Sequence, residues 1–236
     1  MFLHHVEGRF GVPESAFPFR RIVVSLFLVL SGYLLFSIYG NRAKKIELLP
    51  FFKKRIVRIF PLYLAVLVMG LAIFWHSWVP KLATEPVSII TTLLARFFLV
   101  QCWYPEYDFV MGLGNGVTWT LSVILFCYFL FPFLIRCGKW LWLVFVVLAI
   151  ADVAAIWQIS QMSFEHVTHA SIVHLFPPFR MLEFIMGMLA AQVSQHQLPE
   201  SWRRFRLSMT VLDVVVVVGM MFAWFIMLDW FTLQIR

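Results

Sequence analysis

The sequence predicts an all-α protein, a polytopic bundle of transmembrane helices, on three observations. Of the 236 residues, 62% are hydrophobic, and the mean hydropathy is +0.87. Charged residues make up only 13%, about half the fraction that is usual in a soluble domain. The Lys and Arg residues gather in short stretches between long apolar runs. The net charge of +7 therefore indicates membrane orientation rather than nucleic-acid binding.

Five apolar runs are long enough to cross a bilayer, which takes about 20 mostly apolar residues. They are Ile22–Tyr39, Ile59–Trp78, Thr118–Ile135, Trp140–Ile159 and Leu207–Phe231. A sixth run, Phe179–Val193, is shorter but has apolar flanks. Val87–Val100 is shorter still and carries Arg96, so it is predicted to be a re-entrant or interfacial helix. The sequence therefore predicts about six spanning helices.

Both ends of the chain suggest a larger bundle. The first five residues resemble the outer end of a helix, followed by a loop with Gly and Pro, and the last apolar run stops abruptly at Arg236. We therefore expect one membrane-embedded domain over residues 1–236, with a partial first helix, that is incomplete at both ends.

Loop charges predict the orientation of the bundle. With six spans, Arg42–Arg58, Arg136–Lys139 and Arg203–Arg206 fall on one side and hold seven, two and three basic residues. Ser160–Phe176, on the other side, holds none. Because positively charged loops stay in the cytoplasm, the basic loops are predicted to be cytoplasmic.

The densest basic segment, Phe51–Tyr63, leads directly into an apolar run. Arg55 and Arg58 are spaced i, i+3, so both point to one face of a helix, and Lys54 lies beside them. Two guanidinium groups at a membrane edge can hold phosphates with bidentate geometry. The alternative is an anchor that sets topology and contacts lipid headgroups.

Four polar residues stand in or beside apolar runs. Arg180 and Glu183 are spaced i, i+3, and they either form an ion pair within the helix or orient a substrate. Trp119 and Ser122 share another helix face. For these two, the alternatives are an aromatic belt at the membrane interface and a hydrogen bond to a helix carbonyl.

The sequence predicts neither a disulfide framework nor a metal site. The three cysteines follow no recognised pattern. His166, His169 and His174 have spacings that do not make a recognised ligand set.

Four segments, taken together and in order, resemble the acyltransferase-3 family of membrane O-acyltransferases. The first, Val24–Leu34, is similar to the signature of the family's second helix, and the second, Phe52–Tyr63, to its Arg-x-x-Arg segment. Trp119–Val123, continuing to Pro132, resembles its Trp-Ser-Leu-Ser-Val-Glu helix. Phe179–Gly187 resembles its Arg-Leu-x-Glu-Phe-x-x-Gly segment.

The resemblance implies a bundle of about ten helices in the bacterial inner membrane. It implies transfer of an acyl group from acyl-coenzyme A, a co-substrate rather than a bound cofactor, to a hydroxyl of a sugar, glycan or lipid. His4, with His5 as the alternative, matches the catalytic His. Arg55, Arg58 and Lys54 would contact the donor. Arg180, Glu183, Trp119 and Ser122 would contact the acceptor.

The sequence departs from the family pattern at two positions. Ser25 stands where the second-helix signature has an acidic residue, and Ile124 stands where the Trp-Thr-Leu-Ser-Val segment would continue with Glu. The Arg that precedes the catalytic His would lie before Met1. These departures leave two alternatives open: a non-catalytic membrane binding or transport protein, and an inactive remnant of the same fold.

Overall fold

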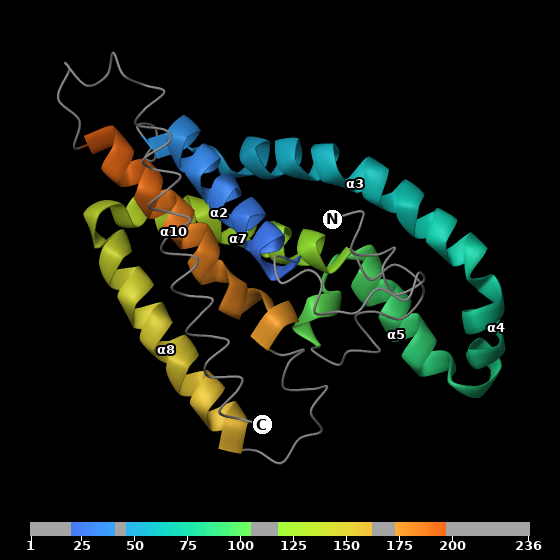
Figure 1. The fold of residues 1–236 in the computed structure, drawn as a ribbon. Helices are drawn as coiled ribbons and strands as arrows, with labels where there is room; N and C mark the ends of the chain where they lie inside the picture. The colour runs from blue at the N-terminus through green and yellow to red at the C-terminus, as the bar shows by residue number, and fades with distance from the viewer. Residues whose placement is uncertain (1–19, 41–45, 105–117, 162–172, 197–236) are drawn as a thin grey trace. The chain divides into compact units, whose positions relative to one another are not determined.

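The computed structural model of the chain describes residues 20–40, 46–104, 118–161 and 173–196, and the regular elements in these ranges are all helices (Figure 1). They belong to two compact units. One is Arg42–Leu182, and the other combines Met1–Asn41 with Glu183–Arg236. The predicted span Leu207–Phe231 lies outside the described residues.

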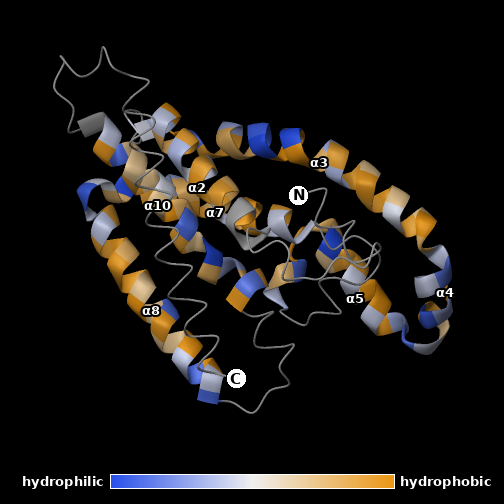
Figure 2. Cartoon of the chain, in the orientation of Figure 1, coloured by the Kyte–Doolittle hydropathy of each residue, from blue (hydrophilic) through white to orange (hydrophobic). Residues whose placement is uncertain are grey.

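Most helices lie where the apolar runs predict them, within a few residues at each end. They are α2 (Arg20–Tyr39), α5 (Pro86–Phe97), α7 (Trp119–Leu134), α8 (Leu141–Gln161) and α10 (Pro177–His196). Apolar residues dominate α8 and much of α7 (Figure 2). Apolar periodicity and length were sufficient to place these elements.

Helix α3 (Leu48–Ile73) differs most from its predicted run, which began at Ile59. It starts early enough to include the whole basic segment. Pro50 is tolerated because it lies in the first turn, where a backbone N–H has no partner within the helix. The helix ends at Ile73, with Phe74 as its C-cap, and α4 (Trp75–Thr84) continues in a new direction (Figure 1). The helix therefore begins before the predicted run Ile59–Trp78 and ends before it.

Helix α5 buries two polar residues. Its buried positions are Ile89, Thr92 and Arg96, one helix face, while Leu94 and Phe97 are exposed. The buried face of α5 therefore carries a charged side chain. After α5 the chain turns at Leu99, which has a φ of 58°, into the short 3₁₀ helix η3 (Gln101–Trp103).

A glycine divides α7 from α8. Gly138, within the 3₁₀ segment η5 (Ile135–Trp140), has a φ of 53° and a ψ of −121°. An L side chain is strained at such a φ, whereas glycine adopts it freely. The chain turns sharply here and continues as α8 (Figure 1).

Among the described residues, two helical stretches are long and apolar enough to cross a membrane, judged by length and composition. They are Leu48–Ile73 and Trp119–Gln161, the second of which joins α7 and α8 through η5. Val24–Tyr39 and Pro86–Phe97 are apolar but shorter. The count of about six spans stays a prediction.

In the second unit, α2 and α10 lie side by side with almost no space between their backbones (Figure 1). A Cβ added to Gly32 would lie 2.0 Å from the carbonyl oxygen of Phe184, and one added to Gly187 would lie 1.9 Å from that of Val29. Such close approach between small residues is typical of helix packing in membranes.

Candidate functional site

Polar side chains gather around the first turn of α7, within the Arg42–Leu182 unit. We call this group the α7 N-terminal cluster. Its members come from the end of α5, from η3, from α7 and from the start of α10: Arg96, Gln101, Cys102, Thr118, Trp119, Ser122 and Arg180. All except Trp119 are buried. A buried polar group of this size is costly unless its members are hydrogen-bonded or bind something.

Gln101 connects η3 to the start of α7. Its Nε2 donates to the carbonyl oxygen of Thr118 at 3.2 Å and to Thr118 Oγ1 at 3.4 Å. The thiol of Cys102 donates weakly to the carbonyl oxygen of Trp119 at 3.5 Å. Burial raises the pKa of Cys102 to about 12, so the thiol is neutral at physiological pH and is no nucleophile.

Arg96 has the largest side chain that is fully buried among the described residues, with 0% of its surface exposed. Its position is fixed from α3, because the hydroxyl of Tyr63 donates to the Arg96 carbonyl oxygen. Tyr63 also packs against Leu67 and Leu99. The turn that follows α5 is therefore held where it brings Arg96 and Gln101 to the cluster.

Arg180, at the start of α10, lies over the Trp119 ring. Its Nε donates to the carbonyl oxygen of His174 at 3.0 Å, and its guanidinium carbon lies 5.7 Å from the ring centroid. Trp119 also packs against Cys102 and Leu175. Trp119 therefore joins the interior of the cluster rather than a belt with Trp103, whose ring contacts Phe126 and Phe176.

Ser122 is buried one turn into α7. Its hydroxyl makes no hydrogen bond to a helix carbonyl among the described residues, and the side chain with which it interacts is the Cys102 thiol. The predicted bond to a helix carbonyl is therefore absent. The structure thus brings three of the sequence-predicted residues, Trp119, Ser122 and Arg180, into one cluster.

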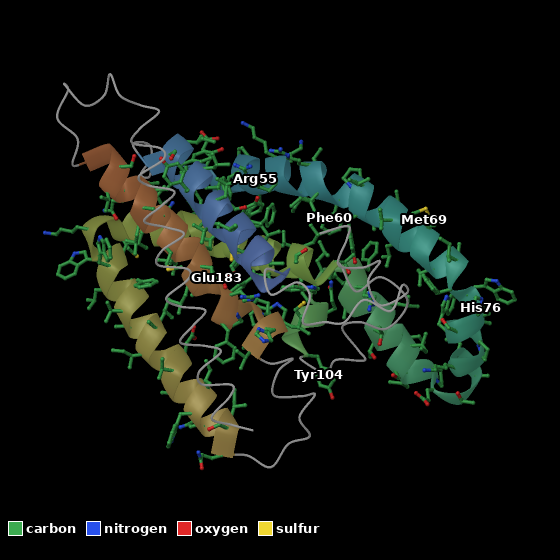
Figure 3. The ribbon with its side chains drawn as sticks, in the orientation of Figure 1. Arg55, Phe60, Met69, His76, Tyr104 and Glu183 are labelled. Carbon is green, nitrogen blue, oxygen red and sulfur yellow. The ribbon has the colours of Figure 1, made fainter. Side chains whose placement is uncertain are left out.

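The basic residues of α3 differ in exposure. Arg55 is half-buried, with its guanidinium carbon 5.4 Å from the ring centroids of both Phe51 and Tyr128. Arg58 is exposed, as are Lys53 and Lys54. Figure 3 shows Arg55 on the first half of α3. Arg55 is therefore fixed by aromatic faces, while its neighbours project from the protein.

Glu183 lies on α10 within the other unit (Figure 3). It is buried, and its Oε1 accepts a hydrogen bond from Ser25 Oγ at 2.8 Å. Ser25 thus provides a neutral partner for Glu183 at the position where the family signature has an acid. Ile124, at the other departure, is buried in the core. The ion pair between Arg180 and Glu183 stays a prediction.

His4 and His5 lie outside the described residues. Within the described ranges, no three His, Cys, Asp or Glu side chains gather closely enough to hold a metal ion.

Sequence analysis did not identify Arg96, Gln101 or Tyr63 as residues of a site. The sequence did mark Arg96 as a candidate, because it is an ionisable residue in an apolar run and such residues usually face the protein interior. Gln101 gave no signal, since its role depends on the turn at Leu99 and on the start of a helix that lies 17 residues further along the chain.

Comparison with known proteins agrees with the motifs. A family model described as an acyltransferase domain matches residues 1–235. The chain is similar to the acyltransferase MdmB of Streptomyces mycarofaciens, with 29% identity over 184 residues. The aligned part is 73% of this chain and 46% of the relative, so the chain spans about half the length of that protein. No solved structure matches significantly.

The four motif segments and the family model identify the same family, and the family model matches almost the entire chain. The chain belongs to the acyltransferase-3 family.

Proposed function

We propose that the protein is an integral membrane acyltransferase. It transfers an acyl group, for example acetyl, from acyl-coenzyme A to a hydroxyl of a sugar, glycan or lipid. Family membership supports the reaction class, and the similarity to a protein named as an acyltransferase agrees with it. The protein acts in the bacterial inner membrane, with its basic loops in the cytoplasm.

The observation that carries the proposal is the basic first half of α3. Arg55 is fixed between two aromatic rings, and the side chains of Lys53, Lys54 and Arg58 are exposed beside it. Coenzyme A carries several phosphate charges. A guanidinium whose orientation is already fixed loses little entropy when it binds a phosphate. The flexible lysines add attraction at longer range.

The reaction needs a base, a donor for the oxyanion and a fixed thioester. His4 is the proposed base, since the pKa of imidazole lies near neutral pH. It removes the hydroxyl proton as the acceptor oxygen bonds to the thioester carbonyl carbon, whose π electrons move to the carbonyl oxygen. The C–S bond then breaks, and coenzyme A leaves as a thiolate that receives the proton.

A binding or transport protein without chemistry is the second candidate. Two observations favour it. The family acid is replaced by Ser25, which donates to Glu183 instead of adding a second carboxylate. Ile124 places an apolar side chain in the core where the family has Glu. This protein would bind acyl-coenzyme A but would not release its thiol.

Binding of acetyl-coenzyme A to the purified full-length protein in nanodiscs tests the donor site. The double variant Arg55→Lys/Arg58→Lys keeps charge and topology but loses the guanidinium forks, so we expect at least about tenfold weaker binding. Arg136→Lys, another exposed arginine on the same predicted side, is the matched control. If the double variant and the control both bind as wild type does, α3 does not hold the donor.

Substitution of the histidines tests the chemistry. His4→Ala should slow transfer by about two to four orders of magnitude and leave donor binding intact. His5→Ala should have a milder effect, because adjacent residues of a helix point about 100° apart. Equal, small losses for both variants would exclude a histidine base and favour the second candidate.

A further inference from the structure

Helix α4 has an apolar face that the rest of the described chain leaves largely uncovered. Trp75, Trp78, Val79 and Leu82 share this face, at helical spacing, and no residue of α4 is buried. The opposite side is polar and carries Lys81. We propose that the apolar face of α4 lies in the headgroup boundary of the lipid bilayer, and that α5 enters the bilayer from there without crossing it. This inference rests on the proposed membrane location and adds α4 as a lipid-binding element.

Hydrogen bonds at the joint with α3 fix the direction of α4. The indole Nε1 of Trp78 donates to the Leu71 carbonyl oxygen at 3.0 Å, in the last turn of α3, where carbonyl groups have no partner within the helix. The backbone N–H and the hydroxyl of Ser77 both donate to the carbonyl oxygen of Phe74, at 2.9 and 2.7 Å. The apolar face of α4 therefore has a fixed direction relative to α3.

The length of α3 places this joint at a membrane boundary. The helix has 26 residues, about 39 Å at the rise of an α-helix, whereas the hydrocarbon core of a bilayer is about 30 Å thick. Its first half carries the basic segment, and its second half is apolar (Figure 2). With Lys53 and Lys54 at one boundary, α3 reaches the other boundary near Ile73, just before α4 begins. Tryptophan is enriched at such boundaries, because the indole combines an apolar ring with a polar N–H.

Exposed apolar side chains continue from the end of α3 through α4 and along α5. They are Met69, Ile73, Trp75, Val79, Leu82, Val87, Ile90 and Leu94. Water would solvate such a surface poorly, whereas lipid acyl chains solvate it well. Lys81, on the polar side of α4, can extend to lipid phosphates. The headgroup boundary therefore suits both sides of α4.

Two lengths, estimated independently, indicate that α5 ends inside the bilayer. Helix α5 has 12 residues, about 18 Å, which is too short for a core of about 30 Å. It leads from α4 back toward the start of α7 (Figure 1). Its last turn meets α3 where the Tyr63 hydroxyl donates to the Arg96 carbonyl oxygen. Tyr63 lies about 15 Å before the end of α3. The length of α5 and the depth of its contact with α3 therefore agree.

Quenching by spin-labelled lipids tests the depth of each helix. The full-length protein, with Cys137→Ser to remove the partly exposed thiol, would carry one bimane-labelled cysteine at a time in vesicles of phosphatidylcholine and phosphatidylglycerol. Leu82→Cys should be quenched at least about twofold more by a nitroxide near the headgroup than by one near the acyl-chain end, because the apolar face of an interfacial helix lies about 5–10 Å deep. Leu62→Cys, on an exposed site of α3, and Leu94→Cys, near the end of α5, should show the reverse order.

Lys81→Cys is the matched control, since it lies on the polar side of α4. Aqueous iodide should quench it, and lipid nitroxides should quench it at least about twofold less than Leu82→Cys. Equal lipid quenching of these two variants would overturn the proposal for α4. So would protection of Leu82→Cys from both lipid and iodide, which would show that a second copy or another protein segment covers the face.

The other two labelled positions separate the remaining outcomes. Stronger quenching of Leu94→Cys by the headgroup nitroxide would show that α5 lies along the surface, and would overturn the proposal for α5. If lipid quenches Leu62→Cys but not Leu82→Cys, the membrane location stands and the proposal for α4 fails. If lipid quenches neither, the membrane location itself is rejected, and the proposed function fails with it.

Discussion

The α2–α10 pair and the α7 N-terminal cluster both join segments that are far apart in the sequence, but they do so by opposite means. In the pair, Gly32 and Gly187 bring two backbones together with no side chain between them. In the cluster, Gln101, Arg96 and Arg180 reach one helix end with long polar side chains. The pair should therefore be sensitive to added volume, and the cluster to changed chemistry.

The largest expected effect follows from adding volume to the pair. Gly187→Val should prevent stable folding, since even a Cβ would lie 1.9 Å from the Val29 carbonyl oxygen and 2.8 Å from the Tyr33 nitrogen. Backbone atoms cannot move aside as a flexible side chain can, and overpacking typically costs about 1–3 kcal/mol or more. The yield of folded protein in detergent, measured by size-exclusion chromatography, checks this.

Leu34→Phe is the control for that variant, because it enlarges a half-exposed position of the same helix. Its yield should equal that of the wild type. A Gly187→Val protein that elutes and melts like the wild type would show that the two backbones do not meet.

A smaller effect is expected from the polar contact of the pair. Ser25→Ala removes the hydrogen bond to Glu183, which should lower the free energy of unfolding by about 1–3 kcal/mol. Ser31→Ala is the matched control, since that hydroxyl bonds only within α2, to the Phe27 carbonyl oxygen. Thermal melts of both variants give the comparison. Equal decreases in the free energy of unfolding for the two variants would mean that the hydrogen bond from Ser25 to Glu183 stabilises the protein no more than a bond within one helix does.

Tyr63 supports the cluster through a single hydroxyl. Tyr63→Phe should lower the free energy of unfolding by about 1 kcal/mol, because it removes the bond to the Arg96 carbonyl oxygen but keeps the buried ring. Tyr63→Leu should cost more, since the ring also packs against Leu67 and Leu99. Denaturant titration measures both variants. If Tyr63→Phe has no effect, α5 is held by its apolar contacts alone.

The smallest effect concerns thiol reactivity at neutral pH. Cys102 is buried and has a pKa of about 12, whereas Cys137 is partly exposed. Maleimide should therefore label Cys137 and leave Cys102 unmodified in the folded protein. Mass spectrometry of labelled peptides measures the labelling of both thiols. Labelling of Cys102 as fast as Cys137 would show that the cluster is open.

The same thiol makes the stability of the protein depend on pH. Between about pH 9 and about pH 12 the Cys102 thiol ionises in the unfolded chain but not in the folded protein, so the free energy of unfolding should fall as the pH rises through this range.

Local sequence pattern predicted the helices better than the site. The bounds of α7 and α10 follow from apolar runs that need no knowledge of the rest of the fold. The apolar run that predicts a span begins only after Lys53, Lys54 and Arg55, because charged residues interrupt the apolar pattern, but these residues are good helix formers and α3 includes them.

The candidate site was predicted only where a motif marked it. Arg180 and Trp119 belong to segments that resemble the family, and the structure brings them together. Gln101 belongs to no such segment, and its contact with Thr118 depends on the turn at Leu99. Contacts of this kind are set by tertiary structure, which a single sequence does not reveal.

The most direct test of the proposed reaction is thiol release by the purified full-length protein. The protein would be given acetyl-coenzyme A labelled in the acetyl group, together with a panel of sugar, glycan and lipid acceptors. The acyltransferase account predicts that one acceptor gains label, in equal amount to the free coenzyme A thiol that appears, and that His4→Ala slows both equally. Saturable binding of the donor without thiol release for any acceptor would contradict it.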